Sequence, residues 1–157
     1  MRMSEREVVG TANILEILDK CDSIRIGLSV NDRPYIVPMD FAFEAIGDSV
    51  SIYMHCAREG KKMDMIAKNN NVCFEADHSH EIIKAEAACH WGAKFESVMG
   101  EGKIFVVDDD KERVKAMDLL MRRHGFVGRP NYEPKALAAA AVLRISVTSM
   151  TGKRKRS

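Results

Sequence analysis

Residues 35–43, Tyr-Ile-Val-Pro-Met-Asp-Phe-Ala-Phe, carry the clearest strand pattern in the chain. Their largest apolar side chains fall mainly at every second position, which is the spacing of one face of a β-strand. The preceding Asn31-Asp32-Arg33-Pro34 has turn chemistry and follows an apolar strand expected at 24–30. On the other side, Gly47-Asp48 leads into another expected strand at 50–56. Three strands joined by short turns predict an antiparallel meander.

The remaining segments add further strands and three helices. Apolar residues at helical spacing predict helices over 4–19, where Ser4 and Glu7 fit a capping box, after Lys61, and after the acidic cap at 108–110. Strands are expected at 72–76, 94–107 and 143–147. Within 94–107, Gly100 and Gly102 indicate a bulge or a close backbone approach.

The order of these elements predicts a mostly β fold. A doubly wound α/β sheet needs helices between nearly every pair of strands, and this chain does not have them. We therefore expect a six-stranded antiparallel β-barrel with inserted helices. It would form a single domain over 1–157, with a basic tail at 150–157.

Composition favours a soluble globular protein. The 157 residues are 46% hydrophobic and 30% charged, with a net charge of +1. This balance favours neither nucleic acid nor acidic partners, although four basic residues gather at 153–156. We interpret them as a solvated tail, with weak steering of an anionic ligand as the alternative.

The cysteines and the hydropathy of the chain bear on its location. The four cysteines form no C-x-x-C pair, no secretory signal is recognised, and no apolar run could span a membrane. We therefore expect a reducing cytoplasm.

The segment 52–66 suggests an anion site beside a histidine. It reads as a strand that reaches His55, turns, and opens a helix at Gly60-Lys61-Lys62. A helix start offers unpaired N–H groups and partial positive charge, and lysines add full charges. Strand parity turns His55 away from the more apolar face, toward a polar surface or a pocket. The alternatives are a histidine hydrogen-bonded at a strand end and lysines that are ordinary surface residues.

Two further features limit the chemistry. Pro38 lies within a well-formed strand and has no N–H, so its segment is an edge strand or faces a ligand. We expect no metal site. The chain has a group of potential metal ligands, but their spacing does not match a recognised metal-binding motif; they are His78, His80, Cys89 and His90. Neither a phosphate-binding Walker loop nor a serine or cysteine nucleophile motif is present.

Five motifs occur in an order that resembles a known family. They are Arg33–Met39, Ile52–Ala57, Gly60–Asp64, Phe95–Gly102 and Thr151–Lys153. Together they resemble the FMN-binding split-barrel flavoproteins. The similarity is greatest to the branch related to pyridoxamine 5′-phosphate oxidase that includes the nitroimidazole-resistance reductases.

The resemblance implies a split barrel that forms a homodimer, with FMN at the subunit interface. Lys61 and Lys62 would hold the phosphate, and His55 would face the flavin ring as the candidate catalytic residue. The ring would be lined by Val37, Pro38, Met39, Cys56 and Ala57. Less direct contacts, from the same chain or its partner, would come from Phe95, Ser97 and Val98.

The implied activity is that of an FMN-dependent oxidoreductase that passes electrons to a small acceptor such as a nitro compound. The arginine-rich C-terminal segment of the oxidase itself does not occur here, which argues against that enzyme's activity. A donor such as NAD(P)H would bind only transiently, because the chain has no Rossmann fingerprint. The alternatives are a flavin-storage protein, a haem-binding split barrel, and another ligand such as a deazaflavin.

Overall fold

The structure is a computed structural model that describes residues 3–156. In chain order the elements are η1 (Ser4–Arg6), β1 (Glu7–Val8), α1 (Thr11–Lys20), β2 (Ile24–Val30), β3 (Arg33–Met39), β4 (Ala42–Ile46), β5 (Ser49–Ala57), α2 (Lys61–Lys68), β6 (Asn71–Ile83), η2 (Ala88–His90), β7 (Gly92–Val106), α3 (Asp110–Arg123), α4 (Pro134–Ala139) and β8 (Ala140–Lys155).

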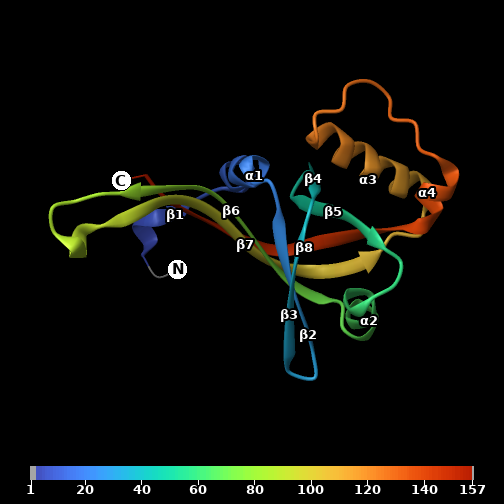
Figure 1. The fold of residues 1–157 in the computed structure, drawn as a ribbon, viewed down its shortest axis with the longest axis horizontal. Coiled ribbons are helices and arrows are strands. Elements are labelled where there is room, and N and C mark those ends of the chain that lie inside the picture. The colour runs from blue at the N-terminus through green and yellow to red at the C-terminus, as the bar shows by residue number, and fades with distance from the viewer. Residues whose placement is uncertain (1–2, 157) are drawn as a thin grey trace.

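The strands form one antiparallel sheet that curves without closing (Figure 1). Its order is β3-β2-β6-β7-β8-β5-β4, and β1 pairs with β8. This confirms the predicted mostly β, antiparallel fold with inserted helices. The described residues form eight strands rather than six, because β1 is an additional short strand and the stretch 35–43 is divided.

The predicted meander is wrong at Asp40. β3 ends at Met39 and pairs with β2, whereas β4 begins at Ala42 and pairs with β5, so the two strands lie at opposite edges of the sheet. Met39 and Phe41 nevertheless stay buried, with 8% and 1% of their surfaces exposed. The alternation of apolar and polar residues indicates which side chains are buried, but it does not indicate which strands pair with each other. The sequence pattern therefore gives no sign of the break at Asp40.

The predicted helix over 4–19 is shorter than expected. Gly10 has a φ of 91°, outside the helical region, and α1 starts at Thr11. Ser4 lies in the 3-10 turn η1, so it does not form the expected capping box. β1 pairs with the end of β8 and buries Val8.

The basic tail expected at 150–157 is, as far as Lys155, part of strand β8. Lys153 and Lys155 pair in register with Ser97 and Phe95 of β7, and the Arg154 guanidinium forms an ion pair with Glu96. The backbone ladder and this acidic partner hold the segment in the sheet. Local charge alone did not indicate either interaction.

The curved sheet encloses the main core. Ile17 and Leu18 of α1 and Met65 and Ile66 of α2 pack into the concave interior. The third helix, α3, instead lies on the outside of β4, β5 and β8, over a small second core that includes Tyr53. Figure 1 shows α3 and α4 at one end of the molecule and the long β6–β7 hairpin extending toward the other.

Candidate functional site

A cleft of about 440 Å³ opens at the break in the barrel. One wall is the end of β3 and the residue that follows it, and the other is the end of β5 with the first turn of α2. The lining residues are Ser23, Pro38, Met39, Asp40, His55, Cys56, Ala57 and Lys62. Six of these were predicted site residues, and the fold brings them together from three separate segments.

Both walls of the cleft are strand edges. β4 pairs with β5 only as far as Tyr53, and within residues 3–156 the segment 54–57 is paired on one side alone, by β8. β3 likewise has β2 as its only neighbour in the described chain, which confirms that Pro38 occupies an edge strand. Backbone N–H and C=O groups along such edges are available to a planar ligand with donors and acceptors on its rim.

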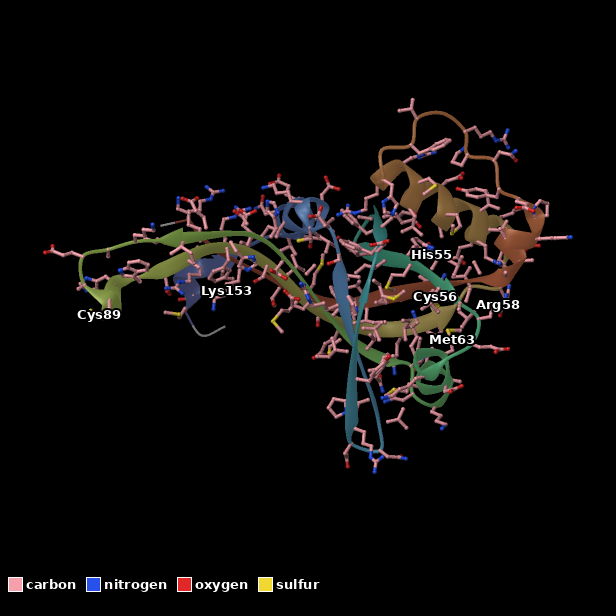
Figure 2. The ribbon with its side chains drawn as sticks, in the orientation of Figure 1. His55, Cys56, Arg58, Met63, Cys89 and Lys153 are labelled. Carbon is pink, nitrogen blue, oxygen red and sulfur yellow. The ribbon has the colours of Figure 1, made fainter. Side chains whose placement is uncertain are left out.

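His55 and Cys56 present different chemistry to the cleft. The His55 side chain is exposed, on the face of β5 away from the main core, as strand parity predicts. Cys56 is half-buried, and its Sγ lies 3.8 Å from Sδ of Met63. Burial raises the pKa of the Cys56 thiol, while the nearby Lys62 ammonium acts in the opposite direction. Figure 2 shows these side chains at the end of the molecule that carries α2.

The side chains of the adjacent lysines, Lys61 and Lys62, lie in different surroundings. Nζ of Lys62 lies in the cleft, 3.2 Å from Sδ of Met39. Nζ of Lys61 lies 4.1 Å from the centre of the Tyr35 ring, where it makes a cation–π contact. Gly60, with a φ of 123°, precedes the helix and lets the chain turn sharply into α2. Lys62 is therefore the lysine that faces the cleft in a single chain.

The remaining predicted site residues lie outside the cleft of their own chain. Val37 packs against the main core, and Val98 is fully buried within it. Phe95 and Ser97 are on β7, opposite Lys155 and Lys153 of β8. Figure 2 places Lys153 well away from His55, toward the end of the molecule that carries Cys89.

Sequence reasoning missed two residues of the cleft, Ser23 and Asp40. Asp40 stands at the break between β3 and β4, and Ser23 lies in the connection from α1 to β2. Neither belongs to a motif. Each reaches the cleft only because the chain changes direction there.

The histidines of the β6–β7 hairpin remain apart from the cleft. Nε2 of His80 lies 3.1 Å from Oδ2 of Asp77, and Cys89 and His90 lie in η2 at the tip. Across residues 3–156, no three His, Cys, Asp or Glu side chains are grouped so that they could hold a metal ion.

Comparison with known proteins identifies the family. Residues 11–154 match the sequence model of the pyridoxamine 5′-phosphate oxidase family. The chain belongs to this family. None of the curated proteins matches the sequence.

Solved structures confirm the resemblance in fold. A proposed 5-nitroimidazole antibiotic resistance protein from Bacteroides thetaiotaomicron is 29% identical, with a TM-score of 0.81 over 94% of this chain and 86% of that one. The flavocytochrome Anf3 from Azotobacter vinelandii also has a TM-score of 0.81, at 18% identity, over 100% of this chain and 72% of that one. The FAD binding protein from Mycobacterium smegmatis has a TM-score of 0.62 at 22% identity, over 95% and 98% of the two chains. At these lower identities the likeness concerns the fold alone.

Residues 3–156 include no helix that combines the length and the apolar character needed to cross a bilayer.

Proposed function

We propose that this member of the pyridoxamine 5′-phosphate oxidase family binds FMN in the cleft between β3 and β5 and acts as an oxidoreductase. The observation that carries the proposal is the pairing of two open strand edges with Lys62 at the start of α2. The edges suit the hydrogen-bonding rim of a flavin ring, and the lysine with the helix N-terminus suits its phosphate. The cleft volume of about 440 Å³ lies within the usual range for cofactor sites.

A small acceptor such as a nitro compound fits the open side of this site. Bound flavin supplies the hydride and electron transfer, and the protein supplies position and proton control. The His55 imidazole is exposed in the cleft wall, where it can donate a hydrogen bond or a proton to the acceptor. The nitroimidazole-resistance description of the 29% identical relative supports this class of acceptor.

We also propose that the protein is a homodimer with the cofactor between its subunits. The outward face of β3, β2, β6 and β7 carries Ile36 and Met99, which are 68% and 60% exposed, around an apolar groove of about 550 Å³. Arg25 on the same face contacts Glu75 and Asp77, so both signs of charge are present. A self-complementary patch of this kind suits a two-fold interface. It would also bring Phe95 and Ser97 of one copy toward the other.

A cytoplasmic location goes with this proposal. All four cysteines carry free thiols, and Cys73 and Cys89 are exposed. Exposed thiols persist in reducing compartments.

The proposal is tested by the colour and turnover of the purified protein. We expect a yellow protein that releases FMN on denaturation and reduces a nitro acceptor with NADH or NADPH as donor. His55→Ala should lower the steady-state rate about 10²-fold while FMN stays bound. The control His124→Ala changes an exposed histidine after α3 and should leave the rate unchanged.

Two outcomes would contradict parts of the proposal. A colourless protein that does not take up added FMN would remove the cofactor assignment. A yellow protein with negligible rates in both the wild type and His55→Ala would indicate flavin storage instead of catalysis.

A further inference from the structure

Arg123, the last residue of α3, binds the C-terminal end of another helix. Its Nη2 lies 3.1, 3.0 and 2.5 Å from the carbonyl oxygens of Leu18, Asp19 and Cys21, and its Nη1 lies 3.1 Å from Oδ1 of Asp19. The last carbonyls of a helix have no partner within the helix, and a guanidinium supplies donors to several of them at once. Arg123 therefore fixes the segment through which α1 passes into β2.

The same guanidinium also contacts the chain where it crosses the opening of the barrel. Its centre lies 4.4 Å from the ring centre of Phe41 and 5.9 Å from that of Phe43. Phe41 is almost fully buried and directly follows Asp40, in the link between β3 and β4. A guanidinium stacked on an aromatic face at this distance is attractive, and burial strengthens the attraction.

Both segments held by Arg123 continue into the same wall of the cleft. Two residues after Cys21 comes Ser23, and immediately before Phe41 come Met39 and Asp40; all three line the cleft. Strand pairing holds this wall only as far as Met39, which pairs with Ile24 of β2. Ser23 precedes β2, and Asp40 lies in the link before β4 starts at Ala42, so these two residues are outside the strands.

We infer that Arg123 is a positioning residue that sets the width of the cleft. It does not line the cleft, and it joins α3 on the outside of the sheet to the wall formed by Ser23, Met39 and Asp40. This inference rests on the proposed function only where flavin binding is the readout.

The first test measures the cleft without any cofactor. Cys56 lines the opposite wall and is half-buried, so its alkylation rate by iodoacetamide, resolved by mass spectrometry, reports how far the cleft opens. We expect Arg123→Met to raise this rate about tenfold, and Arg123→Lys to raise it less because an ammonium keeps the charge without the planar fork. Arg122→Met is the matched control on the exposed side of the same helix, and it should leave the rate unchanged.

A second variant and a series of urea concentrations distinguish a wider cleft from loss of the fold. Phe41→Leu removes the closer of the two aromatic contacts and leaves the carbonyl hydrogen bonds of Arg123 in place, and it should give a smaller increase in the same direction. The rate is also followed in low concentrations of urea. Local opening gives little dependence on urea, whereas reaction through global unfolding follows the full unfolding slope.

The second test uses flavin affinity. Arg123→Met should weaken FMN and riboflavin by the same factor, about tenfold, because the wall next to the ring moves while the phosphate end stays intact. Lys62→Ala should weaken FMN only, since riboflavin has no phosphate.

The results separate the two proposals. If the wild type binds no flavin, the proposed function fails, and the Cys56 rate still tests Arg123. An unchanged Cys56 rate in folded Arg123→Met, or an increase that follows global unfolding, would overturn the positioning role.

Discussion

At the scale of single residues, Lys61 and Lys62 are equivalent in sequence but not in the structure. Lys62 faces the cleft, and Lys61 is engaged with the Tyr35 ring. We therefore predict that Lys62→Ala weakens FMN binding about tenfold and flattens its dependence on salt, because a charged contact with phosphate is lost. Lys61→Ala should have a smaller effect. Titration of FMN fluorescence at two salt concentrations measures both, and equal losses in the two variants would contradict the assignment.

The buried thiol of Cys21 links stability to alkaline pH. Burial, followed by the charge of Asp77, raises the pKa of Cys21 from 9.0 to about 11. Below pH 9 the thiol is neutral in both states and stability does not depend on it. Between pH 9 and 11 the unfolded chain releases this proton and the folded protein does not, so stability falls as pH rises, by about 2–3 kcal/mol. Urea unfolding over this range should show the decline, and Cys21→Ala should show a smaller one. The same decline in the variant would assign it to other groups.

At the scale of elements, the sequence patterns correctly predicted those strands and helix ends that depend on interactions between residues close in the chain. Strand β2 and the cap of α3 match their predictions; the Asp109 carboxylate accepts a hydrogen bond from the Glu112 N–H at 2.8 Å. Six of the residues that line the cleft also belong to the sequence motifs that predicted the site. The separation of β3 from β4 at Asp40 depends on which edge each strand joins, and no local signal specifies that choice.

Glycines in strand β7 leave room for the backbone of the neighbouring strand. The sequence indicates a bulge or a close backbone approach at Gly100 and Gly102, and the structure has both. The β7–β8 register shifts between Glu101 and Gly102, and a Cβ at either glycine would meet a backbone oxygen of β8. A Cβ at Gly100 would lie 2.6 Å from the backbone oxygen of Ser149. We expect Gly100→Ala to destabilise the fold by about 1–3 kcal/mol, because backbone cannot move aside easily.

The matched control for this change lies at the start of the same strand. A Cβ at Gly92 would also come within 2.6 Å of another atom, but that atom is Nζ of Lys155, at the end of a flexible side chain. Gly92→Ala should change the free energy of unfolding by less than about 0.5 kcal/mol. Thermal or urea unfolding of the two variants decides the matter, and equal losses would show that steric contact with the backbone is not the cause.

At the scale of the whole molecule, the cleft and the Phe95–Ser97 segment lie in different parts of one chain. A two-fold dimer through the outward face of β3, β2, β6 and β7 would join them, which ties cofactor affinity to assembly. We predict that Ile36→Asp with Met99→Asp converts a dimer to monomers and weakens FMN binding, because unpaired carboxylates would be buried in the interface. The control Val127→Asp changes a side chain that is 92% exposed in the loop after α3, and it should do neither. Sedimentation equilibrium with and without FMN measures the assembly. A wild type that stays monomeric at micromolar concentration and still binds FMN tightly would exclude a shared site.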